Sequence, residues 1–281
     1  PAMPIMTTFF HANSMLMQLS ITCMLFSFAF CQLVVGVLVD RFGKRVIVLM
    51  ALILLTVSNM LCALTHSIVF FLLLRVFTGV GAGCCNVIAR TLLVGNFQGE
   101  ALRKYSSYLY LSWALVPMLA PLLGGYMVHY INWQAIFLFL SLICLCYFFV
   151  IYKSFEEKAF VAKEVNFSIA LKKYVILMQG DHKYFMHLLV CVVLSYATLI
   201  TIIQALPFYL ADAHQYSSVG IARVLLIIGL ATILGVFINL RLLKRNRSTV
   251  VIYSGLFIML FSSLIMLKHH QNLGHVFSLA I

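Results

Sequence analysis

An arginine inside an apolar run is the first feature of this sequence that could do chemistry. Arg75 lies about eight residues into the run at 67–94, or about 12 Å along a helix that rises about 1.5 Å per residue. An unpaired guanidinium is costly in apolar surroundings, so we expect Arg75 to face a partner or a cavity. The alternative is that its long side chain reaches back to the nearer surface. Three glycines follow and predict close packing against a second helix: Gly79, Gly81 and Gly83.

A charged turn lies between the first two apolar runs. Asp40, at a helix end, can pair with a basic group or with a helix N-terminus. Gly43 permits a tight turn, and Gly36 allows another helix to approach closely. A loop that only sets orientation in a membrane would explain the basic residues but not the order of the whole motif, which is Gly36, Asp40, Arg41, Gly43, Lys44 and Arg45.

Two prolines and two glycines mark a later run. Pro117 and Pro121 each free a backbone carbonyl, which bends a helix. Gly124 and Gly125 beside them permit close contact and flexing. The alternative is a simple kink with no functional role.

The residue types that hold metals or act as nucleophiles form no cluster in the sequence. The eight cysteines lie within apolar runs, without a C-x-x-C pair or histidines at ligand spacing, which is typical of small packing residues. None of the seven acidic residues lies deep in an apolar run. We therefore expect no metal, no cofactor and no enzymatic activity.

Lipid must surround the elements that position these residues. Apolar residues make up 64% of the chain and charged residues only 9%, whereas a soluble domain carries about 25% charged residues. Runs of about 20 apolar residues cross a bilayer as helices. The net charge of +12 is divided into short clusters between these runs, a placement that argues against nucleic acid as a partner.

The apolar runs predict an all-α membrane protein with about eight spans and the start of a ninth. Residues 1–10 are expected to form a short loop. Two halves, 1–152 and 184–281, are predicted on either side of a polar linker at 153–183, within which an amphipathic segment at 165–178 suits a membrane surface. The spans are expected at residues 15–38, 46–64, 67–94, 105–128, 133–152, 184–210, 219–243 and 249–267, with the ninth beginning near 276.

Lysine and arginine gather in alternate loops. Sixteen of the nineteen lie on one side of this predicted topology, Lys268 lies on the other, and Arg75 and Arg223 lie within spans. Because basic loops stay in the cytoplasm, the 153–183 linker is predicted to be cytoplasmic.

The motifs together resemble a known family, the major facilitator superfamily. The turn at 36–45 resembles its signature loop. Arg75 with the following glycines resembles the fourth-helix arginine motif of its drug/proton antiporters, and Pro117 to Gly125 resembles their fifth-helix motif. Further segments are similar to bicyclomycin- and chloramphenicol-resistance exporters, at residues 1–4, 89–90, 120–125, 133–137 and 207–208.

The resemblance implies a bundle of twelve helices in two halves, of which helices two to nine are represented here. Residues 1–4 would then end the first helix, and this chain would be a fragment. The turn at 36–45 would be a cytoplasmic latch, and an acid that pairs with Arg75 is expected in the first helix. The expected coupling and substrate cavity contains Arg75, Gln32, Asn86, Tyr108 and Gln204.

The expected function is efflux of drugs or other small amphipathic compounds in exchange for protons. The resemblance places this activity in a monomer of the bacterial inner membrane, working by alternating access. Two alternatives remain open: transport of another solute, such as a siderophore, amino acid or sugar, and a transport-inactive membrane remnant.

Overall fold

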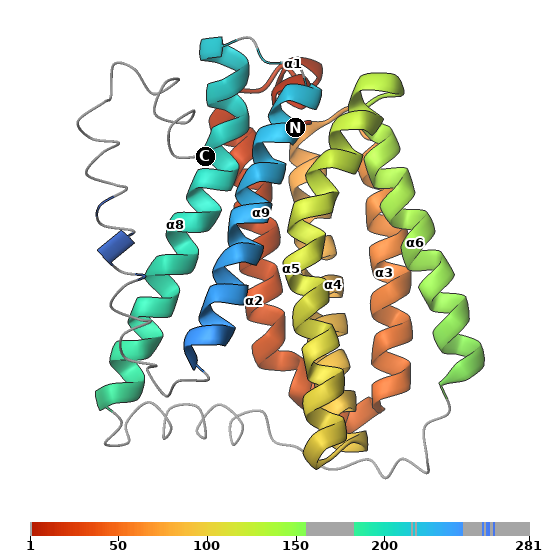
Figure 1. Cartoon of the computed structure of the whole chain (residues 1–281). Helices are drawn as coiled ribbons and strands as arrows, with labels where there is room; N and C mark the ends of the chain where they lie inside the picture. Colours follow the sequence, from red (N-terminus) through yellow and green to blue (C-terminus); the bar gives the residue numbers. More distant parts are fainter. Residues whose placement is uncertain are drawn as a thin grey trace.

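The computed structural model describes residues 2–155, 183–214, 216, 218–243, 255, 257, 258 and 261. These residues form long helices joined by short connections, which run up and down alongside one another (Figure 1). The helices are α1 (Met3–Phe9), α2 (Ser14–Phe42), α3 (Lys44–Leu64), α4 (Ile68–Asn96), α5 (Gly99–Tyr130), α6 (Gln134–Ser154), α8 (Lys183–His214) and α9 (Ser218–Leu243).

Local side-chain chemistry begins several of these helices. The Asn13 side chain accepts the backbone N–H of Leu16 at 2.8 Å at the start of α2, and Ser67 does the same for Phe70 at the start of α4. Such caps satisfy N–H groups that the helix itself leaves unpaired. Gly43 has a φ of 87°, a conformation that favours glycine, and it lets α3 begin directly after α2.

The described helices include five that are long and apolar enough to cross a membrane: α2, α3, α4, α6 and the Val193–Leu210 part of α8. Large apolar side chains cover their outer faces, and Leu142 and Phe149 on α6 are 57% and 52% exposed. Exposed apolar surface of this extent is typical of a surface that meets lipid. The prediction of an all-α membrane protein is confirmed.

The most extensive contact joins α4 to α2, and α3 packs between α4 and α6 (Figure 1). The Ser141 hydroxyl of α6 donates to the Thr56 carbonyl of α3 at 2.9 Å, which is the kind of polar contact that ties helices together in lipid. Helix α5 packs mainly against α9, so a helix of the predicted N-terminal half contacts one of the predicted C-terminal half.

Two sequence predictions about local structure were wrong. Residues 1–10 are not a loop, because α1 is a helix with a proline in its first turn, where proline needs no hydrogen-bond partner. Asp212 does not lie in a loop either, since α8 continues to His214. The helices are also longer than the apolar runs: α2 continues to Phe42 and α5 begins at Gly99, because charged residues at the ends of a span can stay helical in the polar interface.

Several predictions fall outside the described residues. These are most of the 153–183 linker with its amphipathic segment, all but four residues of the span at 249–267, and the start of the ninth span. The division into two halves at the linker stays a prediction.

Candidate functional site

Arg75 lies inside the helix bundle between two aromatic rings. Its guanidinium carbon is 5.0 Å from the ring centroid of Phe71 on the same helix and 4.5 Å from that of Phe137 on α6. Its Nη1 donates to the Met24 sulfur of α2 at 3.8 Å, and Cys62 of α3 lies close enough to interact with the charge. Four helices therefore surround this guanidinium.

Two donor atoms of Arg75 have no acceptor among the described residues. Nε and Nη2 are buried and make no hydrogen bond there. These two atoms are enclosed by the helices, which favours the alternative that Arg75 faces a partner or a cavity. A buried donor without an acceptor costs about 1–3 kcal/mol, and more when the group is charged. The two cation–π contacts each contribute about 2 kcal/mol when they are shielded from water, which is of the same size as this cost.

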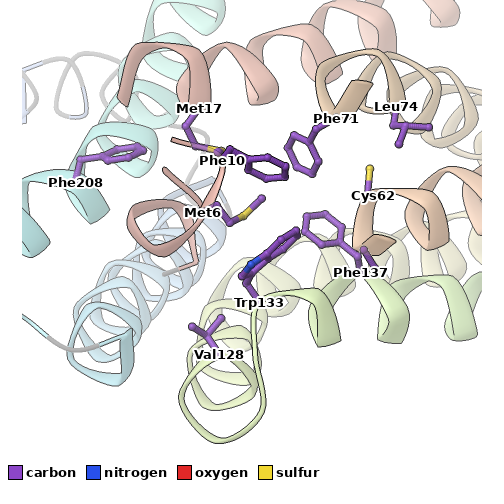
Figure 2. Close-up of a cluster of buried hydrophobic side chains, with 11 residues drawn as sticks. Met6, Phe10, Met17, Cys62, Phe71, Leu74, Val128, Trp133, Phe137 and Phe208 are labelled. Atoms are coloured by element: carbon purple, nitrogen blue, oxygen red, sulfur yellow. The ribbon is translucent and has the colours of Figure 1, made fainter. Parts of the chain in front are cut away.

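Phe71 and Phe137 belong to a buried cluster that is rich in aromatic side chains (Figure 2). The rings of Phe71 and Phe137 lie 5.7 Å apart, and Phe10 contacts Phe71 at 5.3 Å. Trp133 is 5.8 Å from Phe137 and 5.5 Å from Phe10. Trp133 and Phe137 are four residues apart on α6, so they share one face of that helix. The segment at 133–137, which entered the sequence analysis only as a point of resemblance, thus supplies one wall of the Arg75 site.

Glycines of α4 let its neighbours come close enough to enclose the arginine. A Cβ atom on Gly79 would collide with the Met24 carbonyl and the Ser27 hydroxyl of α2, and one on Gly81 would lie 3.0 Å from the Ala51 carbonyl of α3. The two glycines therefore serve different neighbours. The prediction that the glycines after Arg75 permit close packing is confirmed.

The other predicted cavity residues are not joined to Arg75. Gln32 and Asn86 are half-buried on α2 and α4, Gln204 is half-buried on α8, and Tyr108 is 56% exposed on α5. Among the described residues no hydrogen bond links any of them to Arg75 or to one another. Asn86 shares the face of α4 with Arg75 but lies about 16 Å further along the helix. Their place in one cavity stays a prediction.

The charged turn at 36–45 is tied to the end of α6. The Arg45 Nη2 donates to the Tyr152 carbonyl at 2.8 Å, one of the carbonyls that a helix C-terminus leaves unpaired. Its guanidinium also lies 5.9 Å from the Tyr152 ring, while Arg41 lies over the Phe42 ring at 5.3 Å. Lys44 extends toward the end of α4, where a Cβ on Gly95 would be 3.5 Å from its Nζ.

Two other residues of the turn meet no partner in the described part of the chain. A Cβ on Gly36 would have nothing within 4 Å, so the close helix approach expected there is not found. Asp40 is exposed, and no described residue forms an ion pair with it. The glycines that do permit close approach are those of α4.

The proline and glycine motif lies within α5, and that helix runs through both Pro117 and Pro121 without interruption. A Cβ on Gly124 would be in ordinary contact, 3.7 Å from the Ile136 Cδ1 of α6. Gly125 is buried. The helix therefore does not break at this motif, and Gly124 lies in contact with α6.

The residues that touch the guanidinium were not among those predicted from the sequence. Phe71 is four residues before Arg75, so helical spacing could have placed it on the same face. No comparable signal in the sequence pointed to Met24, Cys62 or Phe137, because they lie on other helices.

Lipid-facing helices that enclose a buried charge define a multi-pass membrane protein, and comparison with known sequences defines its family. The sequence model of the Major Facilitator Superfamily matches residues 1–281. The chain belongs to the major facilitator superfamily, a family of membrane transporters rather than enzymes.

Individual relatives include resistance proteins of bacteria. The uncharacterized MFS-type transporter YdgK of Bacillus subtilis (strain 168) is 28% identical over 240 residues, covering 85% of this chain and 60% of the relative. A chloramphenicol resistance protein of Pseudomonas aeruginosa is 34% identical over 146 residues, 50% of this chain and 34% of the relative. Multidrug resistance protein D of Escherichia coli (strain K12) is 31% identical over 120 residues, 43% and 30%. The chain spans 60% or less of the length of these relatives.

Proposed function

We propose that this protein exports small amphipathic compounds, including antibiotics, across the bacterial inner membrane in exchange for protons. The family supports transport, and the relatives named for multidrug and chloramphenicol resistance support drugs as the substrate class. The observation that supports coupling to protons is that two hydrogen-bond donors of Arg75, Nε and Nη2, have no acceptor among the described residues.

Those donors call for an acceptor that lies outside the described residues. A carboxylate suits them best, because its paired oxygens match the fork of donors on a guanidinium. The described acids with a placed side chain, Asp40 and Glu100, are exposed near helix ends and do not reach Arg75. The acceptor in this proposal is a carboxylate on another helix of the full-length protein.

Such a pair would couple proton movement to transport. An ionised carboxylate holds the guanidinium strongly, whereas a protonated one holds it weakly. Protonation would therefore free Arg75 from the helix that carries the carboxylate, and the two protonation states would favour different arrangements of the bundle. The aromatic wall of Phe71 and Phe137 keeps water from screening the charge, which makes this difference large.

The contact between α5 and α9 fits alternating access, because it is the most extensive contact between the two predicted halves. In the proposed cycle one half rocks against the other around a central site, which Gln32, Asn86, Tyr108 and Gln204 would help to line. The turn at 36–45 and the 153–183 linker would lie in the cytoplasm, and the protein would act as a monomer.

A susceptibility assay tests the proposal. Full-length protein is produced in a bacterial strain without its own efflux pumps, as wild type, Arg75→Ala and Arg90→Ala. Arg90 is a matched control because it is an exposed arginine on the same helix. We expect wild type and Arg90→Ala to raise resistance to chloramphenicol-type compounds, and Arg75→Ala to remove it at equal amounts in the membrane. Full resistance with Arg75→Ala would overturn the proposed site.

A second measurement isolates proton exchange. In inverted vesicles with an acidified interior, adding a transported drug should raise the internal pH in wild type but not in Arg75→Ala. Drug movement without any change in internal pH would contradict proton antiport.

A further inference from the structure

Two cysteine thiols face each other across the interface between α2 and α4. The sulfur atoms of Cys31 and Cys84 lie 3.3 Å apart, and the two side chains are only 6% and 7% exposed. Both cysteines are reduced. Cys84 lies nine residues beyond Arg75, about 14 Å along α4, so the thiol pair is separate from the arginine site.

The packing of α4 explains why these thiols meet. A Cβ on Gly83, next to Cys84, would lie 2.8 Å from the Phe28 carbonyl and 3.0 Å from the Cys31 Cβ. The missing side chain at Gly83, like that at Gly79, lets α2 and α4 come this close. The thiol pair is thus held by rigid, closely packed helices, as a preorganised binding site requires.

The site offers two sulfur ligands, which is fewer than a bound metal ion usually has. Cys85 and Cys144 lie nearby, but no group of three or more histidine, cysteine or acidic side chains in the described residues has the arrangement to hold a metal ion. A ligand for this site must therefore be satisfied by two thiols and must tolerate an apolar surrounding.

The distance between the two sulfur atoms indicates which kind of atom could bond to both of them. With a bond to sulfur of about 2.3 Å, as for zinc, a tetrahedral centre would hold its sulfur atoms about 3.8 Å apart and a linear one about 4.6 Å. The observed 3.3 Å corresponds to an angle of about 90° at the same bond length. Trivalent arsenic, whose three bonds form a pyramid with angles close to a right angle, matches this geometry.

We propose that Cys31 and Cys84 form a dithiol site for organic trivalent arsenicals. With phenylarsine oxide, two As–S bonds form, the bond between arsenic and oxygen breaks, and the oxygen leaves as water with the two thiol protons. Arsenic stays trivalent, so the step needs no oxidant or reductant. The apolar phenyl group allows the compound to reach the site through the lipid, and the adduct links α2 to α4 covalently.

The test measures adducts on the full purified chain by intact mass. Phenylarsine oxide is added in the presence of excess 2-mercaptoethanol, which strips arsenic from single thiols but not from a well-placed pair. Cys31→Ser and Cys84→Ser are compared with Cys23→Ser and Cys146→Ser, controls on α2 and α6 that leave the pair intact. Wild type and both controls should retain one phenylarsenic group, released by 2,3-dimercaptopropanol, and the two site variants should show only background.

Peptide mapping of the wild-type adduct gives a readout that no substitution disturbs. The expected product joins the peptides that contain Cys31 and Cys84. Absence of a retained adduct in wild type, retention in both site variants, or an adduct located at other cysteines would each overturn the proposal. None of these results depends on whether the protein transports drugs.

Discussion

The guanidinium carbon of Arg75 on α4 lies 4.5 Å from the ring centroid of Phe137 on α6. Helix α3 packs between these two helices along most of their length. The contact between the Arg75 charge and the Phe137 ring therefore joins two helices that are otherwise separated by α3. The face of a ring carries negative potential and attracts a cation, most strongly where water is excluded. Phe137 thus helps to hold the orientation of a side chain that has unused donors.

Replacing Phe137 by leucine should weaken the proposed transport. Phe137→Leu keeps an apolar side chain but removes the ring face, a loss of about 1–2 kcal/mol of attraction in a water-free site. We expect the initial rate of drug efflux from loaded cells to fall by about five- to thirtyfold, because 1.4 kcal/mol corresponds to a factor of ten. Phe139→Leu is the matched control, since Phe139 is on the same helix but 42% exposed. Equal rates for both variants would contradict the role of the ring.

A larger residue at Gly79 should destabilise the bundle. In Gly79→Val the new side chain collides with the backbone of α2 at Met24, and overpacking of this kind costs about 1–3 kcal/mol. We expect a lower midpoint of thermal unfolding in detergent, followed by intrinsic fluorescence. Gly36→Val tests the same substitution where nothing lies within 4 Å, and its midpoint should stay close to that of wild type. A similar loss in both variants would contradict the packing argument, because valine favours a helix more than glycine does.

Removing the Arg45 side chain should loosen the end of α6. Arg45→Ala loses the hydrogen bond to the Tyr152 carbonyl and the favourable charge at a helix C-terminus. Because the contact is exposed, solvent limits the effect to about 1 kcal/mol or less. Hydrogen exchange of the last turn of α6 should become faster in Arg45→Ala than in Arg41→Ala, which loses only a contact with the neighbouring Phe42. Unchanged protection in both variants would argue against the contact in solution.

The same contact makes a prediction about membrane sides. Because Arg45 bonds to Tyr152, the turn after α2 and the end of α6 must lie at one face of the membrane. With the native cysteines replaced, Arg41→Cys and Lys153→Cys should react with an impermeant maleimide only in inverted vesicles. Tyr130 is the last residue of α5 and is predicted to lie at the opposite face of the membrane, so Tyr130→Cys should react in intact cells. Labelling of positions 41 and 153 from opposite sides would refute both the topology and the proposed cytoplasmic latch.

Much of the fold could be predicted because lipid imposes simple rules on a sequence. A span must be long and apolar, so the runs at 46–64 and 67–94 marked α3 and α4 to within a few residues. A predicted span ends where the apolar run ends, so basic residues that continue the helix are left out of it. The predicted limits of α2 and α5 are therefore too short. The short α1 was missed because its polar threonines and two nearby prolines are typical of a loop as well.

The sequence by itself determined that this is a helical membrane protein with an arginine within one of its apolar runs, because both facts follow from where charges stand along the chain. Only the tertiary structure decided what surrounds that arginine. Met24, Cys62 and Phe137 are far from Arg75 in the sequence, and they meet it because glycines on α4 let α2 and α3 pack closely. Contacts between helices depend on their separation and rotation, which the order of residues along any one helix does not fix.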